Sequence, residues 1–309
     1  MKAITYSEYG SPDVLELTEQ PLPKVGPGMV LVKVKAAAVN PVDWKIMAGY
    51  LDPAMDLQFP AIPGWDAAGV VESVGIDAPH FQPGDEVISY GRKDYVHGGS
   101  FAEYIALPER LLARKPASLT WNEAAGLPLA GLTAYQVLNR LDLKAGETVL
   151  IHGGAGGVGS LGIQIAAARG AKVIATASEK NHDFIRSLGA ESVSYGEGLA
   201  DRVRALRPEG VDVVADFVGG NLESTLAVLA EGGRHASIAD SEVEQHGGTW
   251  MWVNPVGAEL QELADLVDER KLRVEVAQTF PLAQAADAFR LNMEGHTRGK
   301  IVIAVDDAS

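Results

Sequence analysis

Hydrophobic residues in the first 116 positions or so form short runs that Gly, Pro and Asp interrupt. The clearest runs span 29–36, 67–74, 85–90 and 101–107. Short apolar runs bounded by turn-forming residues are typical of β strands. The N-terminal third of the chain is therefore predicted to be β-rich.

The pattern changes after Thr120–Glu123, a capping box that predicts the start of a helix. Apolar strand candidates then alternate with helical stretches. The strands are predicted at 148–151, 172–177, 211–217 and 234–239, and the helices at 160–168, 182–188 and 222–229. Such alternation predicts a parallel sheet covered on both faces. A helix at 258–270, a short strand, a helix at 282–292 and a strand at 300–304 complete the chain.

Charge and composition narrow the function classes. The chain has 26 Lys and Arg against 41 Asp and Glu, a formal net charge of −15, which repels phosphate backbones and disfavours nucleic acid as a partner. Residues 148–168 carry no charge but contain six glycines and His152, so we interpret them as strand, loop and helix rather than a membrane span. With no cysteine and no apparent signal peptide, a reducing, cytoplasmic setting is expected.

The strongest motif is Gly154-x-Gly156-x-x-Gly159, which follows a predicted strand and opens a predicted helix. In a dinucleotide-binding turn the first glycine permits tight turning, the second lets the backbone approach the pyrophosphate, and the third lets helix pack on strand. The helix N-terminus offers free N–H groups to the phosphates. We expect the whole loop to contact the cofactor. It comprises Gly154, Ala155, Gly156, Gly157, Val158 and Gly159.

The end of the second strand bears on which dinucleotide binds. An acidic residue there would accept from the ribose 2′-OH of NAD, whereas a phosphate of NADP needs donors or cations. Ser178 can donate to a 2′-phosphate and Lys180 can neutralise it, which favours NADPH. Glu179 keeps NAD open if it faces the ribose, and Lys180 could instead be an exposed lysine at the start of a helix.

Several motifs outside the glycine loop make the chain resemble the zinc-free quinone oxidoreductase branch of the medium-chain dehydrogenase/reductases. They are Asn40-Pro-Val-Asp43-Trp-Lys45, Pro63-Gly-Trp-Asp66-Ala-Ala-Gly69, Phe81-x-Pro-Gly-Asp85-x-Val87, Gly99-x-Phe101-Ala-Glu103-Tyr, Gly131-Leu-Thr-Ala-Tyr135 and Arg298-Gly-Lys300-Ile-Val. The resemblance implies an α/β protein in which a GroES-like catalytic domain, residues 1–118 and 275–309, joins a Rossmann domain at 119–274. It also implies a cofactor cleft between the domains and a homodimer.

Departures from the zinc-dependent relatives argue against a metal. Those relatives place Cys near position 40 and Gly-His-Glu where this chain has Gly64-Trp65-Asp66. Catalytic zinc needs three protein ligands and an open position, and the seven histidines form no pair at helical ligand spacing. We therefore expect no metal site.

The resemblance implies a set of catalytic residues near the first motif. Asn40 and Asp43 fall where relatives line the substrate cleft. Purely structural roles, a turn residue before Pro41 and a helix cap, explain them equally well. The Asn-Pro-Val-Asp-x-Lys pattern resembles enone and alkenal reductases, in which Lys45 would stabilise a developing enolate oxygen. Tyr50 is a candidate proton donor; Lys45 and solvent are the alternatives.

Further cofactor contacts follow from the same resemblance. Thr133 is expected at the nicotinamide end, and Tyr195 against the adenosine ribose or phosphate. Candidates at strand ends, the edge where open α/β sheets bind ligands, are Phe217, Val218, Ser237 and Ile238.

Together these features predict an NADPH-dependent, zinc-independent reductase that transfers hydride to a quinone or an α,β-unsaturated carbonyl. The alternatives are an enoyl-thioester reductase, and an NADPH-binding sensor or interaction protein with little turnover. The thioester alternative would need a basic cleft for a carrier phosphate, and Arg92 and Lys93 are the only obvious basic pair nearby in the sequence.

Overall fold

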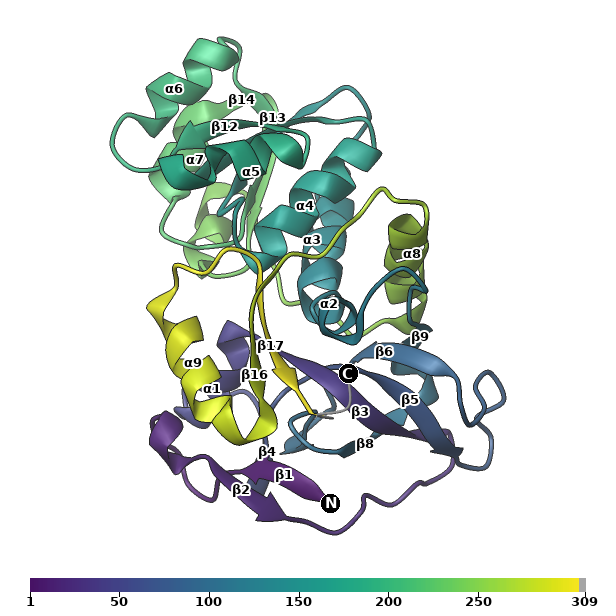
Figure 1. Ribbon diagram of the computed structural model, residues 1–309. Coiled ribbons are helices and arrows are strands. Elements are labelled where there is room, and N and C mark those ends of the chain that lie inside the picture. The colour runs from purple at the N-terminus through teal and green to yellow at the C-terminus, as the bar shows by residue number, and fades with distance from the viewer. Residues whose placement is uncertain (306–309) are drawn as a thin grey trace. The chain divides into compact units, whose positions relative to one another are not determined.

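The computed structural model describes residues 1–305 and divides into two compact units (Figure 1). Unit 1 contains Met1–Leu129, Pro255–Arg270 and the described residues from Val274 on, and unit 2 contains Ala130–Asn254 with Lys271–Arg273. The predicted boundary differs from this division, because residues 119–129 and 255–270 were assigned to the dinucleotide-binding domain. Helices in those two segments pack on strands of unit 1, which explains why they fall in that unit.

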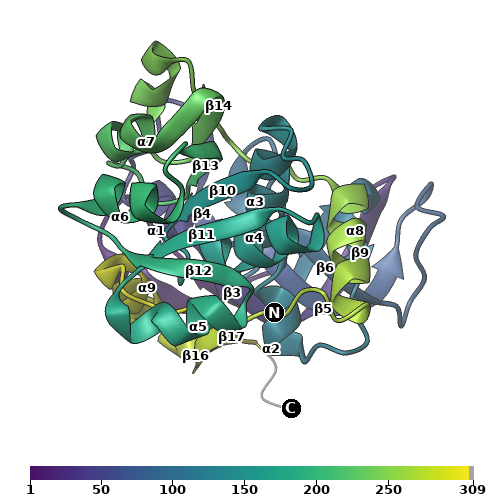
Figure 2. The same cartoon turned by 90° about the horizontal axis from the view of Figure 1, so that it is seen from above.

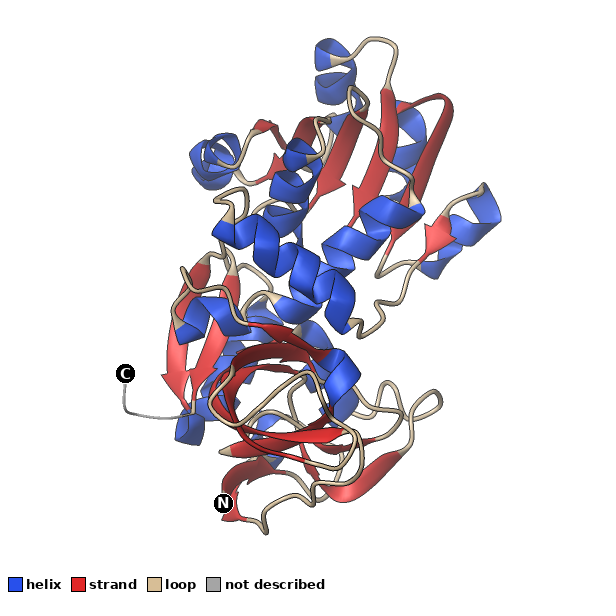
Figure 3. Cartoon of the chain, turned by 90° about the vertical axis from the view of Figure 1, so that its right-hand side faces the viewer, coloured by secondary structure: helices blue, strands red, loops and turns tan. Residues whose placement is uncertain are grey.

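Unit 1 is built on a curved sheet, seen in the lower part of Figure 3, whose strands pair antiparallel except for the parallel pair β16–β17. Its strand order is β16-β17-β3-β5-β6-β9, and β8 also pairs with β3. The strands are β3 (Met29–Val39), β5 (Asp66–Val74), β6 (Glu86–Tyr90), β8 (Tyr104–Pro108), β9 (Leu112–Arg114), β16 (Val276–Pro281) and β17 (Lys300–Ala304). Two short ladders join β1 (Lys2–Thr5) to β2 (Glu16–Glu19) and β4 (Leu57–Ile62) to β7 (Val96–Gly98).

The predicted β-rich N-terminal part is therefore confirmed, with strands at or near all four predicted runs. The unit also carries helices α1 (Pro41–Met47), α2 (Trp121–Ala125), α8 (Gly257–Asp268) and α9 (Ala285–Glu294). The predicted capping box starts α2, since Glu123 N–H bonds to Thr120 Oγ1 at 3.3 Å and Thr120 N–H to Glu123 Oε2 at 2.9 Å. Inward-facing aliphatic residues of β3, β5 and β17 and the aromatic rings of Phe101 and Phe289 form the core of the unit.

Unit 2 contains a six-stranded sheet in the order β12-β11-β10-β13-β14-β15, and all its neighbouring strands run parallel (Figure 2). With β10 as the first strand this order is 3-2-1-4-5-6, the doubly wound arrangement of dinucleotide-binding domains. The strands are β10 (Thr148–His152), β11 (Lys172–Ala177), β12 (Ala190–Ser194), β13 (Val211–Asp216), β14 (Leu229–Ser237) and β15 (Thr249–Trp250).

One helix of unit 2 precedes β10, and the helices after it alternate with the strands as predicted. In chain order they are α3 (Pro128–Arg140), α4 (Gly157–Ala168), α5 (His182–Ser187), α6 (Leu199–Leu206) and α7 (Leu222–Val228). The uncharged segment 148–168 is split between β10 and α4, as predicted. One boundary differs: Leu229, predicted at the end of a helix, starts β14, where it pairs with Val211 beside a register shift. Among residues 1–305 no helix is long and apolar enough to cross a membrane.

Candidate active site

The first group of predicted site residues lies where three strands of unit 1 end or begin. The register pairs Ala38 with Asp66 and Val39 with Ile301. The end of β3, the start of β5 and the start of β17 therefore meet at one place, immediately before helix α1. Asn40 follows β3 there, and Lys300 begins β17. Sheet register thus joins two motifs that are 260 residues apart in the chain.

Helix α1 begins at this junction because its first turn is capped locally. Asn40 is the N-cap residue with extended backbone, φ −125° and ψ 152°, and Pro41 occupies the first helical position. The N–H of Asn40 donates to Asp43 Oδ2 at 2.7 Å.

The side chains of Asn40, Asp43, Asp66 and Lys300, here called the interior polar network, are almost fully buried. Their exposed fractions are 2, 3, 0 and 5%. Asn40 Nδ2 donates to Asp66 Oδ2 at 2.8 Å, and Asn40 Oδ1 accepts a hydrogen bond from Lys300 Nζ. Lys300 Nζ also lies 3.7 Å from Asp66 Oδ2. The amide of Asn40 is thus held at both ends.

Two more main-chain groups complete the network. Lys300 Nζ donates to the carbonyl of Val39 at 3.3 Å, and Asp66 Oδ1 accepts from the N–H of Leu129 at 2.7 Å. Leu129 lies in the first turn of α3, so the positive end of that helix dipole faces Asp66. Buried charges persist in proteins only with this kind of pairing and hydrogen bonding.

The network contains two carboxyls but only one cation. Burial raises the pKa of Asp43 to about 8, opposed by the hydrogen bond from Asn40. Burial also raises the pKa of Asp66, while Lys300 and the hydrogen bonds from Asn40 and Leu129 oppose the rise. The ammonium of Lys300 can neutralise one carboxylate, so the least costly state has Asp66 ionised and Asp43 protonated.

These contacts bear on the predicted roles of Asn40 and Asp43. Both were expected to line the substrate cleft, yet the structure places them in the interior of unit 1 with their polar atoms engaged by protein. Their contact with substrate stays a prediction. The sequence did not identify Asp66 and Lys300 as site residues, although both stand in the quoted motifs. The sequence signals that could have identified them are an aspartate in a buried strand, Asp66, and a lysine at the start of the last strand, Lys300.

Lys45 and Tyr50 both lie close to the indole ring of Trp44. Lys45 Nζ is 5.7 Å from the centroid of the Trp44 ring, and the Tyr50 ring is 6.1 Å from it in an edge-on arrangement. Trp44 is itself held, because its Nε1 donates to Asn292 Oδ1 of α9 at 3.2 Å. Among residues 1–305 the Lys45 ammonium forms no ion pair, so its charge is available to a ligand. Tyr50 is 68% exposed.

The second group of predicted site residues lies at the carboxyl edge of the sheet in unit 2. After β10 the chain turns at Gly153, whose φ of +74° lies in the left-handed region, and α4 begins at Gly157. The turn residue thus precedes the motif. Gly154 is needed for packing instead, since an added Cβ would lie 2.8 Å from Ala175 Cβ.

The other two glycines of the motif, Gly156 and Gly159, differ in the room that each leaves for a side chain. A Cβ on Gly159 would lie 2.1 Å from the carbonyl oxygen of Gly153, which forbids any side chain there. A Cβ on Gly156 would meet nothing closer than 3.4 Å. Gly156 is therefore not required by packing within the protein, and its open surface fits the close approach of a pyrophosphate to the first turn of α4. The loop thus fits the diphosphate of a dinucleotide.

The ends of β11 and β12 lie beside this loop. Thr176 accepts the N–H of Gly153 on its Oγ1 at 3.0 Å and the N–H of Gly154 on its carbonyl at 2.9 Å. The register Ala177↔Ser194 places the next residues, Ser178 and Tyr195, on neighbouring strand ends. Lys180 is exposed and Tyr195 is 58% exposed. Glu179 is also exposed, so both the carboxylate of Glu179 and the ammonium of Lys180 are accessible just after β11.

Asp216, at the end of β13, shapes the remaining predicted contacts. Its carboxylate accepts from the N–H groups of Val218 and Gly219, each at 3.1 Å, and from Ser237 Oγ at 3.0 Å. This holds the turn after β13 with Val218 61% exposed. The hydroxyl of Ser237 is engaged inside the protein, and its carbonyl accepts the N–H of Met251 at 2.9 Å. The sequence analysis missed Asp216; an acid at the end of a buried strand was the signal.

Three further residues were predicted to contact the cofactor. Thr133 is buried within α3, with 4% of its surface exposed. Phe217 and Ile238 follow β13 and β14, at the same edge as the glycine loop. The roles of all these residues toward a cofactor stay predictions.

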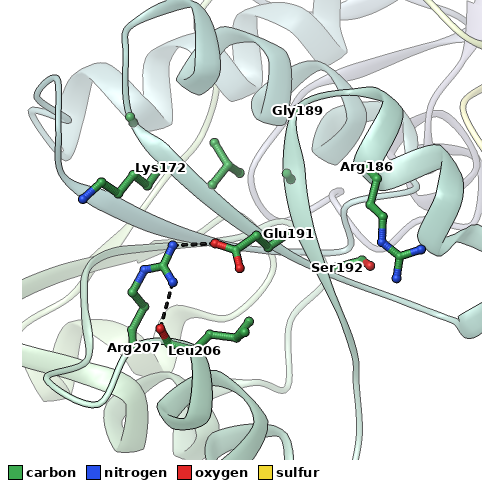
Figure 4. Close-up of a pocket in the computed structure, with 10 residues that line it drawn as sticks. Lys172, Arg186, Gly189, Glu191, Ser192, Leu206 and Arg207 are labelled. Carbon is green, nitrogen blue, oxygen red and sulfur yellow. Dashed lines mark hydrogen bonds and ion pairs between the residues drawn. The ribbon is translucent and has the colours of Figure 1, made fainter.

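A cavity of about 550 Å³ also occurs in unit 2, but at the opposite edge of the sheet (Figure 4). It is lined by the start of β11 at Lys172, the start of β12 with Glu191, and Arg186 and Arg207 from the ends of two helices. Arg207 Nη2 pairs with Glu191 Oε1 at 2.5 Å. Because the glycine loop lies at the carboxyl ends of the strands, this cavity is not the cofactor site.

No group of three or more His, Asp or Glu side chains that could hold a metal ion occurs within residues 1–305. This finding covers only those residues, and the metal-free site stays an expectation.

Comparison with known protein families agrees with both units. An alcohol dehydrogenase GroES-like domain matches residues 26–117, and a model described as zinc-binding dehydrogenase matches residues 188–303. An NADPH-dependent alkenal/one oxidoreductase of Arabidopsis thaliana chloroplasts is 38% identical over 98% of this chain and 79% of its own. The chain belongs to the quinone oxidoreductase-like branch of the medium-chain dehydrogenase/reductase superfamily.

Solved structures of this superfamily superpose over nearly the whole chain. A quinone oxidoreductase from Coxiella burnetii is 37% identical, with a TM-score of 0.88 and 99% of each chain covered. A structure titled NAD-dependent alcohol dehydrogenase is 35% identical, with a TM-score of 0.89, and covers 99% of this chain and all of its own. The predicted family and the GroES-like plus Rossmann fold are confirmed.

Proposed function

We propose that this protein is an NADPH-dependent, zinc-independent reductase that transfers hydride to a quinone or an α,β-unsaturated carbonyl. The observation that carries the proposal is the carboxyl edge of the sheet in unit 2. There Gly156 leaves open space at the N-terminus of α4, and Ser178, Lys180 and Tyr195 stand beside it. Relatives named as alkenal/one and quinone oxidoreductases support the choice of acceptor.

Bound NADPH supplies the hydride. In the proposal the loop 154–159 and the first turn of α4 hold the diphosphate, and Ser178 with Lys180 holds the 2′-phosphate. Thr133 and the main chain near Phe217, Val218, Ser237 and Ile238 complete the binding surface. Exposed Glu179 is the feature that would favour NADH, so measuring both coenzymes tests this assignment.

Lys45 has the chemistry that the acceptor requires. Hydride addition to the β-carbon of an enone moves negative charge onto the carbonyl oxygen. An ammonium with no carboxylate partner can donate a hydrogen bond to that oxygen, and a donor aimed at such developing charge contributes on the order of 10²–10³ in kcat. Trp44 lies against Lys45 and is anchored to Asn292, which restricts where the ammonium can lie. Tyr50, Lys45 itself or water then protonates the enolate.

Oxidation of NADPH and NADH, followed at saturating coenzyme, tests the proposal against quinones, alkenals, simple enones and an enoyl thioester. Lys45→Ala should lower kcat on enones by about 10²-fold or more and leave the Kd for NADPH within twofold. The exposed Lys24, which lies in the same unit, gives the matched control Lys24→Ala. Binding of NADPH with no turnover on any acceptor would favour the sensor alternative. Turnover confined to the thioester would favour the carrier-substrate alternative.

We also propose that the protein forms a homodimer. Strand β15 is the last strand in the order of the six-stranded sheet, and an edge strand can pair with a strand of another chain. Two large apolar side chains at and just beyond this edge are solvent-exposed, Trp250 at 46% and Trp252 at 40%. Light scattering after size exclusion should give twice the chain mass, and Trp250→Glu should shift the population toward monomer. A monomeric unaltered chain would refute this part.

The remaining parts of the proposal concern partners and location. A net charge of −15 supports small-molecule substrates rather than nucleic acid. A cytoplasmic location is proposed on the amino-acid sequence alone, and the Arabidopsis relative is named as chloroplastic. Fractionation of cells that express the protein would test this location.

A further inference from the structure

The turn that follows β12 is held by a single arginine. Arg202 of α6 directs its guanidinium at the carbonyls of residues 194–197, here called the 194–197 turn. Its Nε and Nη2 donate to the carbonyl of Ser194 at 3.0 and 2.8 Å, and its Nη1 donates to that of Glu197 at 2.9 Å. Longer bonds from Nη2 reach the carbonyls of Tyr195 at 3.4 Å and Gly196 at 3.3 Å.

This arrangement uses properties that only arginine has. The planar guanidinium presents several N–H donors in a fixed fork, so one side chain can bind four carbonyls of a tight turn at once. All partners of Arg202 within residues 1–305 are main-chain oxygens rather than carboxylates. The turn itself needs restraint, because Gly196 and Gly198 both have left-handed backbone, with φ of +88° and +74°.

The 194–197 turn carries Tyr195 at the edge where the glycine loop lies. Tyr195 is 58% exposed, and the register Ala177↔Ser194 places it beside Ser178. His182 Nε2 lies 3.5 Å from Ser194 Oγ, which brings the start of α5 against the same turn. An aromatic ring on a restrained turn loses little conformational freedom when a ligand packs against it.

We propose that Arg202 is a positioning residue for the cofactor: it fixes the 194–197 turn so that Tyr195 presents its ring to the adenosine end of NADPH. This inference rests on the proposed function, in which NADPH binds at this edge. Arg202 does not itself touch the cofactor in this account. It lowers the cost of binding by holding Tyr195 in the bound arrangement before the cofactor arrives.

A second arginine on the same helix provides the control. Within the described part of the chain, Arg204 also donates only to main-chain carbonyls, those of Pro208, Ala227 and Leu229, at 3.0 to 3.3 Å. These carbonyls lie around the start of β13 and the end of α7, at the opposite ends of the strands from Tyr195. Removing Arg204 should therefore disturb the protein by similar chemistry without disturbing the 194–197 turn.

The test measures the Kd of NADPH for the full chain by calorimetry, with no acceptor present. Arg202→Ala should raise the Kd about tenfold and, in a separate assay with an acceptor, leave kcat at saturating NADPH within twofold. Arg202→Lys, with one ammonium for four carbonyls, should give an intermediate Kd and keeps the test usable if the alanine variant fails to fold. Arg204→Ala should leave the Kd within twofold.

A double variant separates positioning from general destabilisation. If Arg202 acts through Tyr195, then Arg202→Ala combined with Tyr195→Ala should raise the Kd no further than Tyr195→Ala alone. The inference would be overturned if the two substitutions raised the Kd multiplicatively in the double variant. It would also be overturned if the Kd were unchanged in both Arg202→Lys and Arg202→Ala, or unchanged in Tyr195→Ala. NADPH binding without turnover would refute only the proposed function, whereas no NADPH binding by the unaltered chain would overturn both.

Discussion

Replacing Lys300 by Met removes the only cation of the interior polar network and keeps most of the side-chain volume. In the structure Lys300 is 5% exposed, and its ammonium lies 3.7 Å from Asp66 Oδ2 and donates to the amide oxygen of Asn40. Asp66 is fully buried. The variant would keep the hydrogen bonds to Asp66 from Asn40 and Leu129 but leave its charge unpaired.

The expected loss of stability follows from the distance and the burial. Two unit charges 3.7 Å apart interact by about 4 kcal/mol at an effective dielectric constant of about 20. Breaking a buried pair by removing one partner costs about 3–5 kcal/mol in general. At about 2–4 °C per kcal/mol for a domain of this size, Lys300→Met should lower the Tm by about 6–20 °C.

The loss should also depend on pH. Without the ammonium, the pKa of Asp66 in the folded state lies further above its unfolded value near 3.9. A raised folded pKa means that protonation favours the folded state, so the destabilisation should be largest at pH 8 and smaller at pH 5. Urea unfolding at both pH values, followed by Trp fluorescence, measures it, since Trp44, Trp65 and Trp121 lie in unit 1.

The matched control is Lys172→Met, at an exposed lysine that starts β11. This substitution should change the free energy of unfolding by about 0.5 kcal/mol or less. A Lys300→Met loss below about 1 kcal/mol that is equal at pH 5 and pH 8 would show that Lys300 does not hold a buried carboxylate charge, and the assignment of protons within the network would be wrong.

Three other predictions concern Asp43, the glycine loop and the absence of a metal. The pKa of Asp43, raised to about 8 in the folded state, means that its contribution to stability is present at low pH and is lost as pH rises from about 4 to 8, at up to about 1.4 kcal/mol per pH unit. Asp43→Asn should flatten this slope in urea unfolding, and an unchanged slope would contradict the raised pKa. Gly159→Ala should lower the Tm by several degrees, because its Cβ would meet the Gly153 carbonyl at 2.1 Å. Gly156→Ala should leave the Tm nearly unchanged yet raise the Kd of NADPH about tenfold or more, and equal effects of the two variants on both quantities would refute the distinction. Dialysis against a strong chelator should leave turnover unchanged; a loss restored by Zn²⁺ would show that the reaction needs a metal.

Local patterns in the sequence determined the order of elements and the cofactor loop. Alternating strands and helices, the capping box at Thr120 and the glycine spacing all reflect constraints that act within a few residues, through side-chain periodicity, backbone conformation and steric room. For the same reason the exact ends were less certain. Leu229 is apolar in either a helix or a strand, and only its pairing with Val211 placed it in β14.

Only the tertiary structure decided what the candidate site residues can do. Asn40 contacts Asp66, 26 positions away, and Lys300, 260 positions away, and both contacts depend on how β3 pairs with β5 and β17. Burial then raises the pKa of Asp43, an effect with no local signal in the sequence. The five bonds of Arg202 likewise arise from the packing of α6 against the end of β12. Electrostatic energies depend on distance and burial in three dimensions, and neither quantity is fixed by spacing along the chain.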